Sequence, residues 1–297
     1  MKNNFYITTT LPYVNADPHI GFAMEVVRAD SIARLKRLLD YDVFFNTGSD
    51  EHGQKIYQKA KENNLDPKIY CDNQVKKFYQ LKEALNLSYD QFIRTTDDHH
   101  IKAAQEFWRL CQKNGDIYKA KYKVKYCVGC ELEKTESELI NDHCPIHPNK
   151  EIETIEEENY FFRFSRYQKA LLNFYEKNPH FIQPIFRFEE LKNFIKKGLK
   201  DFSISRVKEK MPWGIPVPND YTQVMYVWFD ALINYISTLG WPKNRQNFEK
   251  FWPGIQIAGK DNLRQQGAMW QAMLLSANLP LSKQIFIEGF IKSEGQK

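Results

Sequence analysis

Four residues near the middle of the sequence have the types and the spacing of metal ligands. Cys127 and Cys130 form one pair, and Cys144 and His147 form a second, in the pattern C-x2-C-x13-C-x2-H. Two such knuckles supply four sulfur and nitrogen ligands, which tetrahedral Zn²⁺ favours and which leave no coordination position for a substrate. The spacing therefore predicts a structural zinc site. His143 is an alternative fourth ligand, although its position fits a knuckle less well.

The other cysteines fit no metal pattern. Cys71 and Cys111 lie in helical patterns, where a thiol behaves as a small apolar core side chain. Because the sequence has five cysteines, a fully paired disulfide framework is excluded. This cysteine usage indicates a reducing compartment, and we expect a cytoplasmic protein.

The loop after the first predicted strand has the residues of a phosphate site. Asp17 can cap a helix whose first residue is Pro18, which places His19 in the first helical turn. Free backbone N–H groups and the positive end of the helix dipole gather there, and an imidazole N–H adds a further donor. Gly21 would let a flat ligand approach the backbone closely. The alternative is a surface loop with an incidental histidine and a glycine at a helix contact.

The order of the predicted elements indicates one α/β domain interrupted by an insertion. Strands are predicted at 5–9, 42–46, 91–95, 223–227, 255–258 and 284–287, and helices at 20–39, 52–63, 67–86, 99–113, 230–239 and 262–276. This alternation predicts a parallel, doubly wound sheet.

Residues 116–220 break that alternation. They contain alternating lysines and aromatics, the cysteines, a strand at 160–164 and helices at 166–177 and 188–200. We therefore expect the first half of the α/β domain at 1–115, a connective insertion with the zinc knuckle at 116–220, and the second half at 221–297.

The composition is that of a globular chain and excludes a chain that is disordered along its whole length. Among 297 residues 42% are apolar, and 42 basic against 37 acidic residues give a net charge of +5. We find no signal peptide and no run of the ~18 uncharged apolar residues that a membrane span requires. The length predicts about two domains.

Two basic stretches keep a nucleic-acid function open. Lys119, Lys121, Lys123 and Lys125 alternate with aromatic residues, which beside a zinc knuckle is typical of an RNA-binding module. The second stretch is usually a solvated helix face but could contact an RNA backbone, and consists of Lys192, Lys196, Lys197, Lys200, Arg206, Lys208 and Lys210. We keep a zinc-knuckle RNA-binding module as the alternative function.

Five separated blocks, in the right order, resemble class I aminoacyl-tRNA synthetases and specifically the methionyl-tRNA synthetase family. The blocks are residues 8–22, 46–53, 201–206, 226–231 and 258–262. The resemblance implies a Rossmann-like catalytic domain split by a connective insertion. It also implies an enzyme that activates L-methionine with Mg·ATP to methionyl-adenylate and passes methionine to tRNA(Met). Another class I synthetase, or a nucleotidyltransferase with the same His-x-Gly device, is the competing enzyme hypothesis.

The resemblance also implies where ATP binds. His19 would be the catalytic residue at the α-phosphate, adenine would pack over Gly21, and the ribose would lie near Gly259 and Asp261. The full set carried over for ATP is His19, Gly21, Phe22, Glu25, Gly259, Asp261 and Ile291. Phe22 departs from the family, whose signature usually ends in a second polar residue.

For methionine, the resemblance implies an apolar pocket with one carboxylate. Asp50 would bind the α-ammonium group, because a cation needs an opposite charge. The walls would be Leu11, Tyr13, Trp228, Ala231 and Tyr235, and Gln266 would also bind methionine. Here Gln265 and Gln266 replace an aromatic-histidine pair found in other members.

The last residues, from Ile291 to Lys297, resemble the opening of the family's mobile K-M-S-K-S loop. Its second lysine and the helical anticodon-reading domain do not occur in this sequence. We therefore expect a fragment of a longer enzyme that keeps the methionine pocket, binds ATP weakly and activates methionine slowly.

Overall fold

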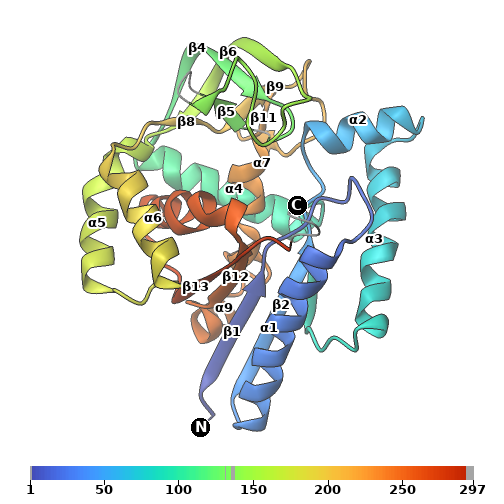
Figure 1. The fold of residues 1–297 in the computed structure, drawn as a ribbon, viewed down its shortest axis with the longest axis vertical. Helices are drawn as coiled ribbons and strands as arrows, with labels where there is room; N and C mark the ends of the chain where they lie inside the picture. The colour runs from blue at the N-terminus through green and yellow to red at the C-terminus, as the bar shows by residue number, and fades with distance from the viewer. Residues whose placement is uncertain (1, 131, 135–137, 292–297) are drawn as a thin grey trace.

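The computed structural model describes residues 2–130, 132–134 and 138–291, and it is built around a parallel sheet (Figure 1). The expected loop at 292–297 lies outside the described residues. The strands of the sheet run in the order β3 (Gln91–Arg94), β2 (Asp42–Ser49), β1 (Asn4–Thr9), β12 (Ile255–Gly259), β13 (Gln284–Glu288) and β7 (Ile182–Gln183). Each neighbouring pair is parallel. The predicted α/β fold with a parallel sheet is confirmed.

Both faces of this sheet are buried. In β1, Phe5 and Ile7 belong to a core with α1 (Ile20–Leu38), α2 (Gln54–Glu62) and α3 (Pro67–Ala84). Tyr6, between them, belongs to a second core with α4 (Asp98–Lys113) and α10 (Trp270–Ser276). Successive side chains of a strand point to opposite faces, so this division means that helices cover both faces.

Two antiparallel sheets form the centre of the insertion. One has the order β5 (Leu132–Lys134), β4 (Ile117–Cys127), β6 (Ile152–Phe162) and β8 (Phe202–Ser203); the other has β10 (Pro216–Val217), β11 (Asp220–Met225) and β9 (Ser205–Val207). In Figure 1 these sheets lie at the end of the molecule toward which the arrow of β1 points. They therefore stand beside the carboxyl ends of the parallel strands.

One stretch within residues 116–220 joins the parallel sheet. Strand β7 pairs with β13, with Ile182 opposite Ile285. The flanking helices α5 (Gln168–Lys177) and α6 (Ile185–Lys196) place Leu171 and Leu191 in the same core as Ile285. A two-residue strand has no period that a sequence can reveal, so its place in the sheet was not foreseen.

Several predicted elements have different bounds in the structure. The helix expected at 230–239 is two short helices, α7 (Val227–Ala231) and α8 (Asn234–Ser237), and strand β11 ends at Met225. The helix expected at 262–276 begins as a 3-10 turn, η3 (Lys260–Asn262), and then a π-helical turn, η4 (Gln265–Met269), before α10. The remaining short elements are η2 (Phe164–Tyr167) and α9 (Arg245–Phe251). Among the described residues, no helix has the length and apolar character needed to cross a membrane.

Candidate functional site

The order of the strands marks one edge of the parallel sheet as a ligand site. From β1 the chain continues to β2 and β3 on one side, whereas β12 lies on the other side of β1. In open α/β sheets, ligands bind at the carboxyl ends of the strands where the order reverses in this way. The Thr10 amide donates to the Ile257 carbonyl at 3.2 Å and joins the two strand ends. The site therefore belongs between the ends of β1 and β12.

His19 caps the helix that starts at this edge. Helix α1 begins at Ile20, and the Phe22 amide donates to Nδ1 of His19 at 3.3 Å. The predicted cap at Asp17 is wrong, because its carboxylate accepts a hydrogen bond from Lys77 instead. A ring nitrogen that accepts carries no proton, so in the neutral imidazole Nε2 holds the hydrogen and can donate it. The side chain of His19 is exposed.

Gly21 and Phe22 affect His19 in different ways. A Cβ added at Gly21 would lie 3.0 Å from Nδ1 and Cε1 of the His19 ring, so a side chain there would press on the imidazole. Phe22 is buried, and its ring meets Phe78 edge-on at 5.6 Å. Its aromatic ring therefore packs in the core, and only its backbone amide contacts His19.

Asp50 lies beside the loop that follows β1. Its amide donates to the Pro12 carbonyl at 2.9 Å, the Val14 amide donates to its carbonyl at 3.4 Å, and Tyr13 is its bridge partner. Asp50 is 5% exposed. Leu11 and Tyr13 are half-buried in the same loop, so three of the residues predicted to bind methionine come from adjoining backbone.

A buried network connects His52, two residues after Asp50, with the second half of the chain. Asp230 accepts hydrogen bonds from His52 Nδ1 at 2.6 Å and from His100 Nε2 at 2.8 Å, and His100 Nδ1 contacts the Ser237 hydroxyl at 2.9 Å. Although burial opposes it, the two histidines lower the pKa of Asp230. Because Asp230 lies on α7, the network brings Trp228 and the loop of Asp50 into one region.

We expect Asp230→Ala to lower the free energy of unfolding by about 3 kcal/mol, because it leaves two buried histidines without their acceptor. Urea denaturation followed by circular dichroism measures this. Glu83→Ala, which removes an exposed carboxylate of α3, is the matched control and should change stability by less than about 0.5 kcal/mol. A loss below about 1 kcal/mol for Asp230→Ala would show that the network does not hold the two halves together.

The charge of Asp50 acts on the hydroxyl of Tyr235. Burial raises the pKa of its hydroxyl well above the usual value, and the carboxylates of Glu25 and Asp50 raise it further. Ala231, at the end of α7, is also buried. Trp270 meets the Tyr235 ring edge-on at 5.9 Å and follows η4 directly. Tyr235 is therefore within electrostatic range of Asp50, and Ala231 lies on the same helix as Asp230.

Gln266 stands in the π-helical turn η4. It is 1% exposed, and its Oε1 has no hydrogen-bond partner in the part of the chain that the structure describes. Single π-helical turns inside helices are frequent at functional sites. The geometry leaves this amide group available for a bound ligand.

Glu25 is a buried carboxyl group at the same edge. Its Oε1 accepts from the Thr10 amide at 2.7 Å and from the Thr10 hydroxyl. Burial raises its pKa to about 8, and the nearby carboxylates of Glu288 and Asp261 contribute to the rise. Glu25 is therefore mostly protonated at neutral pH.

This raised pKa predicts a pH-dependent contribution to stability. The contribution is fully present below the ordinary value of 4.5 and is lost as the pH rises through about 8, because the folded state binds the proton more tightly. It is on the order of 3–5 kcal/mol. Glu25→Gln keeps the acceptor for Thr10 and should remove this part of the pH dependence. Urea denaturation of both proteins at several values between about pH 5 and 8 tests this, and parallel curves would contradict it.

Gly259 is the last residue of β12, and Asp261 follows two positions later. A Cβ added at Gly259 would lie 2.8 Å from Oδ1 of Asp261, so the glycine makes room for this carboxylate. Both residues stand at the carboxyl edge next to β1. Ile291, after β13, is exposed.

The four predicted metal ligands converge in the structure. Their ligand atoms lie within 4.8 Å of one another. The Cys130–Cys144 sulfur distance is 3.5 Å, and Nδ1 of His147 lies 3.9, 3.3 and 4.0 Å from the sulfurs of Cys127, Cys130 and Cys144. Ligands of tetrahedral Zn²⁺ lie roughly 3.4–3.8 Å apart, so this arrangement fits the ion. His143 is exposed and outside the cluster.

The lysines of β4 do not form a free basic surface. Their strand pairs with β6, and Lys119, Lys123 and Lys125 make ion pairs with Asp220, Glu156 and Asp142 at 3.0, 3.4 and 2.6 Å. In the second basic stretch, Arg206 is buried over the Tyr226 ring at 4.1 Å. These pairs weaken the first basic stretch, whereas Lys196, Lys197, Lys200 and Lys208 of the second are exposed.

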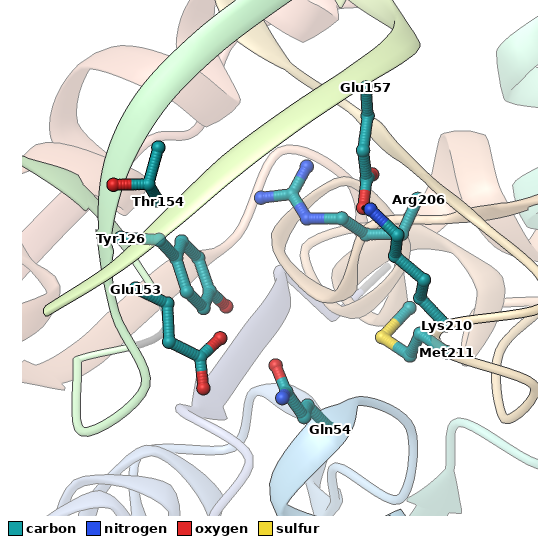
Figure 2. Close-up of a pocket in the computed structure, with 8 residues that line it drawn as sticks. All are labelled: Gln54, Tyr126, Glu153, Thr154, Glu157, Arg206, Lys210 and Met211. Atoms are coloured by element: carbon teal, nitrogen blue, oxygen red, sulfur yellow. Dashed lines mark ion pairs between the residues drawn. The ribbon is translucent and has the colours of Figure 1, made fainter. Parts of the chain in front are cut away.

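Two cavities lie outside the predicted ligand residues. One of about 340 Å³ is lined by Arg163, Ser165, Arg166 and Asp201. The other, of about 150 Å³, separates the insertion from the start of α2 (Figure 2). Gln54 faces Tyr126 and Glu153 across it, and Arg206 and Lys210 lie beside Glu157 (Figure 2). Lys210 pairs with Glu157 at 2.9 Å.

The sequence did not predict the buried polar groups that surround the Asp50–His52 segment. Besides Asp230 and the two histidines, Glu51 accepts from Arg94 at 2.6 and 2.8 Å and from Thr96 at 2.6 Å. A signal existed, because Asp50, Glu51 and His52 are three consecutive ionisable residues shortly after the strand predicted at 42–46. Their hydrogen-bond partners are distant in sequence and carry no local signal of these contacts.

Comparison with known proteins gives concordant matches along the whole chain. A family model described as tRNA synthetases class I (M) matches residues 5–148 and 129–297. Methionine–tRNA ligase of Thermotoga maritima is 47% identical over 298 residues, which cover 99% of this chain and 47% of that protein. The corresponding ligase of Synechocystis sp. is 47% identical over 299 residues, covering 99% of this chain and 56% of that protein.

Solved structures agree with the sequence matches. The crystal structure of Mycobacterium tuberculosis methionyl-tRNA synthetase bound by methionyl-adenylate has a TM-score of 0.93 and 41% identity, and the match covers 97% of this chain and 58% of that chain. The free-state structure of the same synthetase has a TM-score of 0.84 and 38% identity, with 97% and 56% covered. The chain spans about half the length of the relatives it matches.

Proposed function

The chain belongs to the class I tRNA synthetases of the methionine type, and from this premise we propose that it carries the amino-acid activation site of a methionine–tRNA ligase. In this reaction an oxygen of the methionine carboxylate attacks the α-phosphorus of ATP. A bond forms between them, the bond from that phosphorus to the bridging oxygen breaks, and pyrophosphate leaves. The methionyl group then passes to the 2′-hydroxyl of the terminal adenosine of tRNA(Met).

For ATP, the proposal places the nucleotide at the carboxyl ends of β1 and β12. His19 would donate from Nε2 to an α-phosphate oxygen and stabilise the charge that develops there. Gly21 would admit adenine, and Gly259 and Asp261 would contact the ribose. Mg²⁺, when bound with ATP, neutralises triphosphate charge. Catalysis would depend on positioning and electrostatics, with no covalent step for the protein.

For methionine, the proposal gives Asp50 the α-ammonium group. Support comes from its burial and from its place beside Tyr13 and near Tyr235. Trp228, Ala231, Tyr235 and Leu11 would surround the side chain, and the available amide of Gln266 would complete the pocket. The His52–Asp230–His100 network supports this arrangement, because it fixes the loop of Asp50 against α7.

The proposed function also includes a metal site and a tRNA partner. We propose that the cysteine cluster holds one structural Zn²⁺ within the insertion, whose expected range remains 116–220. The insertion stands beside the carboxyl ends of the parallel strands, where the end of a tRNA would have to enter (Figure 1). We also propose a cytoplasmic location and slow activation by these 297 residues alone, both as expected from the sequence.

The observation that carries the proposal is that Asp50 pairs with the loop after β1 and Glu25 bonds Thr10 at the end of the same strand, both at the switch point of the sheet. Screening the twenty amino acids for thermal stabilisation tests it, because a ligand that binds only the folded state raises the melting temperature. Methionine alone should stabilise the protein. Stabilisation by a different amino acid would assign another class I synthetase, and tight RNA binding indifferent to methionine and ATP would favour the RNA-binding module.

A further inference from the structure

Glu288 is a buried carboxylate that has no role in the proposed mechanism. It is the last residue of β13 and lies opposite Gly259 in the register of β12 and β13. It therefore stands at the carboxyl edge of the sheet, one strand beyond the β1–β12 switch point. Its charge acts on Glu25, which places it near the group that bonds Thr10.

Only one carboxylate oxygen of Glu288 has a hydrogen-bond partner among the described residues. Oε1 accepts from Nη1 of Arg28, on α1, at 2.9 Å. The residue is only 7% exposed, and its Oε2 is buried without a hydrogen-bond donor among the described residues. A buried acceptor without a donor is costly, so a native protein retains one where a ligand or another group satisfies it.

The neighbouring groups select the kind of ligand. The side chains of Glu25 and Asp261 are carboxyl groups, so neither offers the Glu288 carboxylate a positive charge. A metal ion is disfavoured, because within the described ranges only the cysteine and histidine cluster has the geometry to hold one. A hydroxyl group of a ligand bound at this edge is one donor that would satisfy the free oxygen of Glu288.

The chain just after Glu288 borders open space. A Cβ added at Gly289, the next residue, would meet nothing within 4 Å. Asp261, proposed to contact the ribose, follows Gly259, the register partner of Glu288. A sugar bound at Asp261 would therefore lie beside the end of β13.

We infer that Glu288 is a further specificity residue for the nucleotide, whose Oε2 accepts a hydrogen bond from a ribose hydroxyl of ATP while Arg28 holds the carboxylate in place. This inference rests on the proposed function, because it requires ATP at the switch point. It makes the site select a ribonucleotide over a deoxyribonucleotide.

Calorimetric titration with ATP, 2′-deoxy-ATP and 3′-deoxy-ATP tests the inference. We expect the wild-type protein to bind one deoxy analogue about tenfold or more weakly than ATP, since a hydrogen bond to a charged group is lost. Glu288→Ala should bind ATP as weakly as the wild type binds that analogue, and it should no longer distinguish the two. Glu288→Gln keeps an acceptor oxygen and should retain part of the preference.

The controls separate the possible failures. Glu249→Ala removes an exposed carboxylate of α9 and should leave all three affinities unchanged. If Glu288→Ala loses the fold by circular dichroism, Glu288→Gln decides, because a wild-type affinity and preference in that variant would place the discrimination elsewhere. Full discrimination in folded Glu288→Ala overturns the inference and leaves the proposed function intact. Failure of the wild-type protein to bind ATP at millimolar concentration contradicts both.

Discussion

Asp50→Ala is expected to abolish methionine binding while the protein stays folded. The side chain is 5% exposed, and backbone hydrogen bonds with Pro12 and Val14 hold the loop independently of the substitution. A buried, charge-assisted contact to an ammonium group contributes about 3 kcal/mol or more, which is a loss of at least ~100-fold in affinity. Calorimetric titration with L-methionine measures it.

A variant that keeps the shape of the side chain tests whether the loss is due to charge. Asp50→Asn keeps the shape of the side chain but cannot neutralise an ammonium group, so it should lose almost as much affinity as Asp50→Ala does. Asp98→Ala, which removes an exposed carboxylate at the start of α4, should bind methionine like the wild type. If Asp50→Asn binds methionine within about threefold of the wild-type affinity, Asp50 does not belong to the pocket.

Periodic patterns predicted the parallel sheet well because its central strands and long helices carry strong local signals. Strand β1 is buried along nearly its whole length, and α1 turns Val26, Ala29 and Ala33 toward the sheet. Elements without a period were not predictable. The two-residue strand β7 and the π-helical turn η4 owe their existence to packing against residues distant in the sequence.

Helix caps illustrate the same limit. Two Asp-Pro pairs carry an identical local signal, and Asp66 caps α3 through the Lys68 amide, whereas Asp17 bonds Lys77 and leaves the cap of α1 to His19. Only the position of α3 beside the loop decides between the two outcomes. This difference changes the site, because it fixes which nitrogen of His19 is free to donate.

The site itself divides into local and distant information. The zinc spacing is complete within residues 127–147 and was read from the sequence, and the structure confirms that the four side chains converge. By contrast, His52 and Asp230 are separated by 178 positions and His100 and Asp230 by 130, so no local pattern could join them. The ligand roles of Asp50 and Trp228 came from resemblance alone, and they stay predictions until binding is measured.

Cys144→Ser is expected to remove the metal and unfold the outer part of the insertion. We expect about one equivalent of zinc per wild-type chain by elemental analysis and far less in the variant, since structural zinc contributes about 10–16 kcal/mol in small domains and serine is a poor ligand. Cys111→Ala removes an equally buried thiol outside the cluster and should keep the metal.

The location of the knuckle also determines where structure should be lost. The cluster closes the far end of the β4–β6 hairpin, at the pairing of Cys127 with Ile152, and the parallel sheet has its own two cores. Amide exchange should therefore rise in β4 and β6 without the metal and stay slow in β1, β2 and β12. Uniform unfolding of the chain would instead make the zinc site part of the main core.

Gly129→Ala separates metal geometry from the number of thiols. A Cβ at this position would lie 2.4 Å from Cγ of His147, so the imidazole must move although all four ligands are still present. Because tetrahedral zinc tolerates little displacement of its ligands, we expect this variant to lose zinc to a chelator markedly faster than the wild type. Equal rates of loss, measured with a chromogenic chelator, would mean that His147 is not a ligand and that the three thiolates hold the ion with another group.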